Sequence, residues 1–151
     1  MKKNRISKNW INKQRRDIYV RQSKIEGYRS RAVYKLKEIN DKFNILRNGQ
    51  SIVDLGGAPG SWSQYLSSTL KNTKLLAIDL LEIQEIKNVK LMKGDFTDDI
   101  YKQKIKSFFN TKIDLVISDM AVNTTGNKNL DAIVTGELAM ESIDFAKGIL
   151  K

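Results

Sequence analysis

Short apolar runs alternate along the chain with longer segments in which apolar residues recur at helical spacing. The short runs are typical of buried strands, and the longer segments are typical of amphipathic helices. The pattern predicts strands at 51–55, 74–78, 89–93 and 113–117 and helices at 31–43, 61–70, 98–109 and 131–150. Ser30 is the predicted N-cap of the first helix and Asp131 of the last. Alternating strands and helices favour an α/β fold, with a parallel sheet covered by helices on both faces.

A glycine-rich turn follows the first predicted strand. Asp54 stands near the end of that strand, and Gly56, Gly57 and Gly60 follow it before the next predicted helix begins. In an open α/β sheet, ligands bind at the carboxyl ends of the strands, where glycines let the backbone approach closely. The spacing fits neither the G-x-G-x-x-G dinucleotide fingerprint nor a P-loop. The turn by itself indicates a nucleotide-type ligand or, alternatively, glycines that serve turn geometry alone.

Acidic residues also follow the other predicted strands. Asp79, Asp95 and Asp119 occupy equivalent positions after the second, third and fourth strands. Asp79 lies 25 positions after Asp54, close to the spacing at which a carboxylate reaches ribose hydroxyls in nucleotide-binding α/β folds. The alternative is a turn or capping aspartate. Repetition of the acid at equivalent strand ends favours a ligand site.

Composition narrows the possible chemistry. The chain has 151 residues, 40% of them hydrophobic, and it contains no cysteine and no histidine. These two absences exclude disulfides, thiolate or imidazole metal sites and the usual general base, so we expect no metal. No apolar run approaches the roughly 18 residues of a membrane span, and no signal-peptide core follows the basic start. We therefore expect a soluble, cytoplasmic protein without a membrane partner.

Positive charge is concentrated at the N-terminus. Residues 1–31 carry eleven basic side chains and two acidic ones, a net +9 out of the +10 of the whole chain. Trp10, Tyr19 and Tyr28 are interleaved with them and offer stacking faces. A basic block with aromatics favours RNA as the partner. A solvated tail or an organelle-targeting peptide, which would place the protein in a mitochondrion or another organelle, is the alternative.

Five segments in register resemble the FtsJ/RrmJ-like RNA 2′-O-ribose methyltransferases. The resemblance covers about residues 7–151, and its segments are Gly27-Tyr28-Arg29-Ser30-Arg31-Ala32-Val33-Tyr34-Lys35-Leu36, Val53-Asp54-Leu55-Gly56-Gly57-Ala58-Pro59-Gly60-Ser61-Trp62-Ser63-Gln64-Tyr65, Ile78-Asp79-Leu80-Leu81, Gly94-Asp95-Phe96 and Ser118-Asp119-Met120-Ala121. It implies a Rossmann-like fold that binds S-adenosyl-L-methionine at the carboxyl ends of its strands. It also implies methylation of a ribose 2′-hydroxyl in RNA.

The resemblance assigns roles residue by residue. Gly60 and Trp62 correspond to residues that line the methionine side of the cofactor, Asp79 to its ribose ligand and Asp95 to a residue beside the adenine. Asp119 corresponds to a residue near the sulfonium that also belongs to the catalytic set, a Lys-Asp-Lys-Glu tetrad whose first lysine matches Lys35. From the residues alone, Lys35 at the edge of its helix's apolar stripe is a lysine whose stem covers that stripe.

The resemblance also implies how the chain is divided, and the sequence departs from the family's pattern in several places. We expect residues 1–30 to form a basic RNA-binding segment, with Arg21, Lys24, Arg29 and Arg31 as RNA contacts, and residues 31–151 a methyltransferase domain. Ser61 stands where the family usually has glycine, and Val122 where it usually has proline. The family's sheet has seven strands and only four are predicted here, so we expect an incomplete chain that ends before the remaining tetrad lysine and glutamate.

The predicted function is S-adenosylmethionine-dependent 2′-O-methylation of large-subunit ribosomal RNA by a monomer. Methylation of tRNA by the same chemistry is an alternative within the family. A non-catalytic RNA-binding or ribosome-assembly factor that retains the cofactor fold is another. A small-molecule methyltransferase is disfavoured by the basic N-terminus.

Overall fold

The computed structural model describes residues 8–121 and 125–151. Val122, which stands where the family usually has proline, and the first seven residues of the expected RNA-binding segment lie outside these ranges. The elements follow in the order α1 (Lys8–Glu26), α2 (Val33–Phe43), β1 (Ser51–Leu55), α3 (Ser61–Thr69), β2 (Lys74–Asp79), β3 (Val89–Lys93), α4 (Asp99–Phe109), β4 (Leu115–Ser118) and α5 (Lys128–Ile149).

The strands form one parallel sheet in the order β3-β2-β1-β4. In the register of its centre, Val53 of β1 lies opposite Leu76 of β2 and Val116 of β4. Because all strands run the same way, their carboxyl ends meet at one edge of the sheet, which we call the carboxyl edge. The predicted α/β architecture is confirmed.

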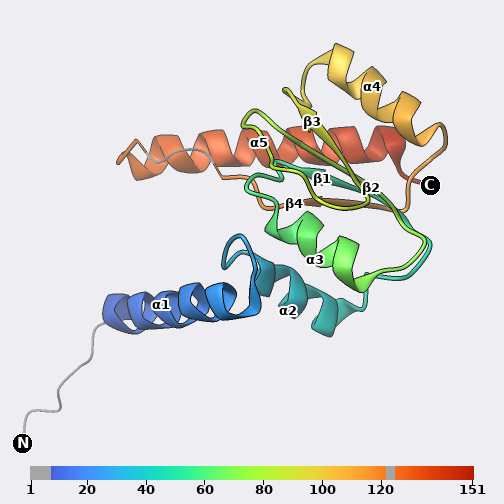
Figure 1. The fold of residues 1–151 in the computed structure, drawn as a ribbon. Coiled ribbons are helices and arrows are strands. Elements are labelled where there is room, and N and C mark those ends of the chain that lie inside the picture. The colour runs from blue at the N-terminus through green and yellow to red at the C-terminus, as the bar shows by residue number, and fades with distance from the viewer. Residues whose placement is uncertain (1–7, 122–124) are drawn as a thin grey trace, which may run out of the picture.

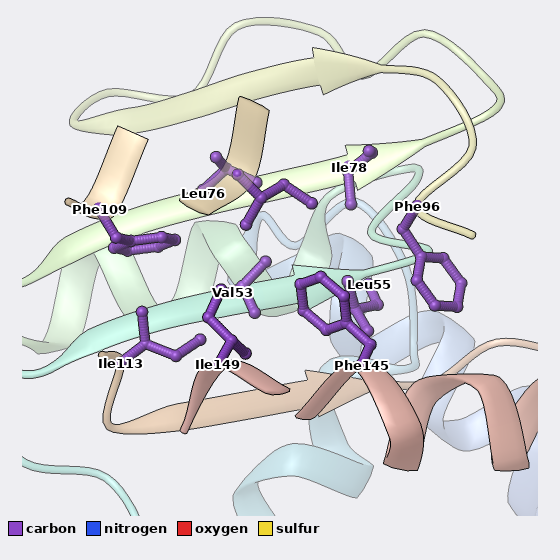
Figure 2. Close-up of a cluster of buried hydrophobic side chains, with 10 residues drawn as sticks. Val53, Leu55, Leu76, Ile78, Phe96, Phe109, Ile113, Phe145 and Ile149 are labelled. Atoms are coloured by element: carbon purple, nitrogen blue, oxygen red, sulfur yellow. The ribbon is translucent and has the colours of Figure 1, made fainter. Parts of the chain in front are cut away.

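Helices cover both faces of the sheet, also as predicted (Figure 1). Val53 and Leu55 of β1 point to the face of α4 and α5, where Phe109, Phe145 and other buried side chains complete the core (Figure 2). Ile52 points to the opposite face and packs with residues of α2 and α3. This two-sided burial explains why the strands read as nearly continuous apolar runs.

Helix α1 was not predicted from the sequence. It extends away from the sheet layers (Figure 1), and in its C-terminal half Tyr19 stacks on Tyr34 of α2 at 5.2 Å between ring centroids. Lys37 Nζ of α2 lies 3.2 Å from Oε2 of Glu26, the last residue of α1, and 4.5 Å from the ring centroid of Tyr28. These contacts fix the C-terminal end of α1 against α2.

Two predicted helix caps were wrong. Ala32, in helical conformation, is the residue that precedes α2, and the hydroxyl of Ser30 accepts from the amide of Ala32 at 3.3 Å and pairs with Ser61. Asn127 caps α5 by accepting from the amides of Asn129 and Leu130, and Asp131 accepts from Thr125. Asx and Ser/Thr side chains serve several local motifs equally well, so their position alone did not identify the cap.

Candidate active site

The glycine turn after β1 is tied to β2. The amides of Gly56 and Gly57 donate to the carbonyl of Ile78 at 2.8 and 3.1 Å. Gly56 has φ +69°, and a Cβ placed on it would overlap the side chain of Met120. Glycine is therefore required at position 56 for both its conformation and the close approach of Met120.

A cavity of about 300 Å³ lies at the carboxyl edge beside this turn. Asp79 and Asp95 line it together with apolar side chains that include Leu80, Phe96 and Leu138. It has the size and mixed lining of a small-ligand site, with a few polar groups in apolar walls. The structure thus brings together two of the acids singled out in the sequence.

Both of these carboxylates are held in place by the backbone. Asp79 Oδ2 accepts from the amide of Ala58 at 3.0 Å and Oδ1 from that of Leu81 at 2.8 Å. Asp95 Oδ1 accepts from the amide and hydroxyl of Thr97 at 2.9 and 2.7 Å. Each carboxylate oxygen has two acceptor lone pairs, so a ligand hydroxyl can still bind to an oxygen that serves the turn. The turn role and the ligand role of Asp79 are compatible.

A second, smaller cavity of about 40 Å³ is also lined by Gly56. Its lining includes Asp54, Ser61, Trp62 and Asp119. Burial raises the pKa of Asp54 to about 7; the hydrogen bond from Ser63 Oγ, 2.8 Å from Oδ2, opposes that rise, and the carboxylates of Asp119 and Asp79 add to it. A buried acid with a pKa near neutrality is typical of functional sites, and pattern reading gave Asp54 no role of its own.

Lys35 and Asp119 meet at this edge although 84 positions separate them in the sequence. Lys35 Nζ, from α2, donates to Asp119 Oδ1 at 2.9 Å and to Oδ2 at 3.1 Å, just beyond the end of β4. The lysine side chain is 58% exposed and that of the aspartate 32%. The pair is therefore open to a large substrate, and it is more than a lysine stem covering an apolar stripe.

Gly60 and Trp62 are embedded in the protein. Gly60 has φ +109°, and a Cβ on it would come within 2.9 Å of Arg29 Nη1 and 2.8 Å of Ile86 Cδ1. It lines neither cavity described above. Trp62 lines the smaller cavity, donates from Nε1 to the carbonyl of Ala32 at 2.7 Å and packs in the core between α2, α3 and the sheet.

The predicted RNA contacts have different surroundings. Arg21 and Lys24 are exposed on α1, and Arg31 is half-buried in the segment just before α2. Arg29 is also half-buried, and its guanidinium donates to three backbone carbonyls. Only the first two of these four residues lie on an open basic surface.

Sequence reasoning missed several residues of the larger cavity. Leu80, Thr97 and Met120 each follow a strand-end acid by one or two positions, so that neighbourhood was the available signal. Leu138 comes from the middle of α5, and no local pattern indicated its place.

A separate groove, about 660 Å³ and lined in part by Lys74 and Lys87, lies at the amino ends of β2 and β3, away from the acids of the carboxyl edge.

Known proteins resemble this chain over most of its length. The family model of FtsJ-like methyltransferases matches residues 28–151. The Ribosomal RNA large subunit methyltransferase E of Pelagibacter ubique is 62% identical over 99% of this chain and 74% of its own length. Its Brucella ovis counterpart is 45% identical over 96% of this chain, which spans 62% of that relative.

Solved structures agree as well. The crystal structure described as a ribosomal RNA methyltransferase from Plasmodium falciparum superposes with a TM-score of 0.75 at 33% identity, covering 82% of this chain and 73% of that one. An epimerase from Methanothermobacter thermautotrophicus, at 22% identity and a TM-score of 0.53, shares the fold.

Across the residues that the structure describes, no helix is long and apolar enough to cross a membrane.

Proposed function

The chain belongs to the FtsJ-like methyltransferase family, and from that premise we propose that it methylates a ribose 2′-hydroxyl of large-subunit ribosomal RNA with S-adenosyl-L-methionine. The observation that carries the proposal is the Lys35–Asp119 pair, exposed at the carboxyl edge beside the two cavities. It places a cation and a carboxylate where a nucleotide on the surface can reach the ligand site.

The larger cavity suits the nucleoside part of that cofactor. Asp79 and Asp95 offer acceptors for hydroxyl and amino hydrogens, and Phe96 and Leu138 offer apolar surface for a base. The smaller cavity, lined by Asp54 and Asp119, offers carboxylates to the positively charged methionine end. When bound, S-adenosylmethionine supplies a methyl group on a sulfonium that is already electrophilic.

The residues of the chain then have to orient the hydroxyl and take its proton. Asp119 holds Lys35 Nζ at the carboxyl edge, and Lys35 in its neutral form accepts the 2′-hydroxyl proton. Alignment of the reacting groups can lower the barrier by about 7–11 kcal/mol. A positioned base adds about 10²–10⁴ in rate. In this proposal Asp119 also lies close to the cofactor, so a single carboxylate links the two reactants.

Helix α1 supplies the RNA-binding surface in this proposal. The exposed Arg21 and Lys24 lie on an element that extends from the sheet layers. Phosphate contacts of this kind position an RNA without reading its sequence. Residues 1–30 as an RNA-binding segment, residues 31–151 as the methyltransferase domain, a monomeric state and a cytoplasmic location remain our predictions.

The test is methyl transfer from S-adenosylmethionine carrying a radioactive methyl group. The protein is incubated in parallel with large ribosomal subunits, free ribosomal RNA and tRNA, and the product is digested with alkali. A 2′-O-methyl group blocks alkaline cleavage of the adjacent phosphodiester, so we expect label in alkali-stable dinucleotides from ribosomal RNA.

Each other result points to one alternative. Alkali-stable label in tRNA alone would favour the tRNA enzyme, and alkali-labile label would reject ribose methylation. RNA binding without any transfer would favour an assembly factor that retains the cofactor fold. Lys35→Ala protein serves as the control for contaminating methyltransferases.

A further inference from the structure

The segment 27–32 between α1 and α2, which we call the strap, is bonded along its length to the glycine turn and the start of α3. Ser30 Oγ lies 2.8 Å from Ser61 Oγ. Gln64 accepts from the amide of Arg29 at 3.1 Å and donates to the carbonyl of Gly27 at 2.9 Å. Together with the Trp62 bond to Ala32, these contacts connect two segments that lie about 30 positions apart in the sequence.

We call these contacts between the strap, the glycine turn and the start of α3 the seam, and Arg29 lies at its centre. Its Nη1 donates to the carbonyls of Pro59 at 3.0 Å and Gln84 at 2.8 Å, and its Nη2 to that of Glu85 at 2.7 Å. A guanidinium has five N–H donors and no acceptor, so most of its capacity serves the protein itself. Three of the five donors are thus committed to backbone carbonyls, which fixes the guanidinium in one orientation.

These three carbonyls belong to the two segments that border the ligand site. Pro59 ends the glycine turn, whose Ala58 amide binds the carboxylate of Asp79. Gln84 and Glu85 belong to the loop that leaves Asp79 and begins with Leu80, a wall of the larger cavity. Arg29 thereby connects the glycine turn to the loop that follows Asp79.

The packing at Gly60 is consistent with this arrangement. A Cβ at that position would crowd Arg29 Nη1 at 2.9 Å. Glycine at position 60 thus makes room for the guanidinium, in addition to allowing the positive φ with which α3 begins.

We infer that Arg29 is a positioning residue for the cofactor site and not an RNA contact. It acts through the glycine turn and the loop after Asp79, which it holds at a fixed separation. The inference rests on the proposed function, because it takes S-adenosylmethionine to be the ligand of the cavity at Asp79. The position of Arg29 in a basic segment predicted a contact with RNA, whereas the inference gives this side chain a role in cofactor affinity.

Lysine is the substitution that separates the two roles. Arg29→Lys keeps the positive charge, so a purely electrostatic contact with RNA survives. An ammonium is a compact charge and cannot reproduce a planar fork that reaches carbonyls on two segments. Loss of cofactor affinity in Arg29→Lys with RNA affinity retained is the signature of a positioning role.

The experiment compares full-length wild type, Arg29→Lys and Arg29→Ala, with Arg47→Lys and Arg47→Ala as controls at an exposed arginine outside the site. Equilibrium dialysis with labelled S-adenosylmethionine gives the cofactor Kd, and filter binding gives the affinity for ribosomal RNA. We expect the cofactor Kd to rise about tenfold or more in both Arg29 variants. We expect unchanged RNA affinity in Arg29→Lys and no effect on cofactor binding at Arg47.

A fluorescence readout keeps the test independent of folding. In a Trp10→Phe background Trp62 is the only tryptophan, and its emission reports the seam through its bond to Ala32. We expect its emission to differ between wild type and Arg29→Lys while the far-UV circular dichroism is the same. Equal emission and equal cofactor Kd would overturn the inference.

The remaining outcomes are distinguishable. Wild type that binds cofactor, with an Arg29→Lys variant that binds it equally well, overturns the inference and leaves the proposed function standing. Reduced RNA affinity with unchanged cofactor affinity returns Arg29 to the RNA surface. Wild type that does not bind S-adenosylmethionine overturns the proposed function and the inference with it.

Discussion

Charged side chains gather at the carboxyl edge of the sheet and on helix α1, and the two regions hold them differently. At the carboxyl edge Asp79 accepts from two backbone amides, Asp54 is buried beside Ser63, and Asp119 is paired with Lys35. On α1, Arg21 and Lys24 are exposed on a helix that extends away from the sheet. The side chains at the carboxyl edge are held in defined positions by their hydrogen bonds. Those of Arg21 and Lys24 contribute positive charge, and no such bond to another described residue fixes their positions.

This difference predicts two kinds of sensitivity. Groups held at hydrogen-bond distance in a partly water-excluded site depend on the position of each atom. Exposed charges act through a summed field that salt screens, so each one matters little. Single substitutions should therefore have large effects at the carboxyl edge and small, salt-dependent effects on α1.

The largest effect is expected for Lys35→Ala. Loss of the group that accepts the proton should lower the rate of methyl transfer by about 10²–10⁴ and leave cofactor affinity nearly unchanged. Single-turnover transfer and equilibrium dialysis measure the two quantities. Lys42→Ala, an exposed lysine on the same helix, is the control and should retain its activity. Loss of cofactor binding in Lys35→Ala would show that the lysine is structural.

The next effect concerns stability and pH at Asp54. Because the pKa of this carboxyl is raised from 3.8 to about 7 in the folded state, the folded protein binds the proton more tightly than the unfolded chain does. The free energy of unfolding should therefore fall as the pH rises from about 4 to about 7. Asp54→Asn cannot lose this proton. Its free energy of unfolding relative to wild type should therefore rise with pH over this range, by at most about 4 kcal/mol.

Urea unfolding of both proteins between pH 4 and 8 measures that difference. Asp114→Asn is the control with the opposite sign, since Lys151 and the amide of Ser51 hold the pKa of Asp114 below its usual value. The stability that wild type gains from Asp114 is complete once the pH exceeds the unfolded pKa, so Asp114→Asn should be less stable than wild type by a nearly constant amount over most of this range. Parallel pH profiles for wild type and Asp54→Asn would contradict the buried, proton-holding role of Asp54.

A smaller effect is expected for Asp79→Asn on cofactor affinity. One amide nitrogen of asparagine would face a backbone N–H of Ala58 or Leu81, where both carboxylate oxygens now accept. The cofactor Kd should rise about 10–100-fold, the cost of one or two charge-assisted hydrogen bonds. Calorimetric titration measures it, with the exposed Asp41→Asn as control. An unchanged Kd would remove Asp79 from the ligand site.

The smallest effect per residue is expected on α1. Arg21→Ala and Lys24→Ala should each weaken RNA binding equally for all sequences and lower the slope of log affinity against log salt by up to about 1. Filter binding at several salt concentrations measures the slope. Cofactor affinity should not change. A large, salt-independent loss in either variant would place a geometrically fixed contact on α1 and break the comparison with the carboxyl edge.

The carboxyl edge was largely predictable from the sequence. Strands at 51–55 and 89–93 have the bounds that the apolar pattern predicted, and α3 and α4 differ from prediction by a residue at one end. In a parallel sheet the end of a strand fixes where the next residue lies. The acids at positions 79, 95 and 119 were therefore placed at one edge by local pattern and topology alone.

Other features needed the tertiary structure. The local pattern of residues 8–26 shows no apolar stripe that core packing would bury, so their helix was not predicted. The partners of Arg29 come from segments 30 and 55 positions away, and no charge pattern contains that information. In the sequence Arg29 is one more member of a basic block, although in the fold its guanidinium is bonded to three backbone carbonyls.

The sequence by itself determined the order along the chain of the strands and of helices α2 to α5, the buried faces and the edge at which the acids gather, because these follow from residue periodicity and chain direction. Only the tertiary structure decided which charges are committed to the protein and which face solvent. Side chains of the same sign and similar length differ in role through the groups within hydrogen-bond reach. For Arg29 and Arg21, eight positions apart, that reach is set by how the strap packs against the glycine turn.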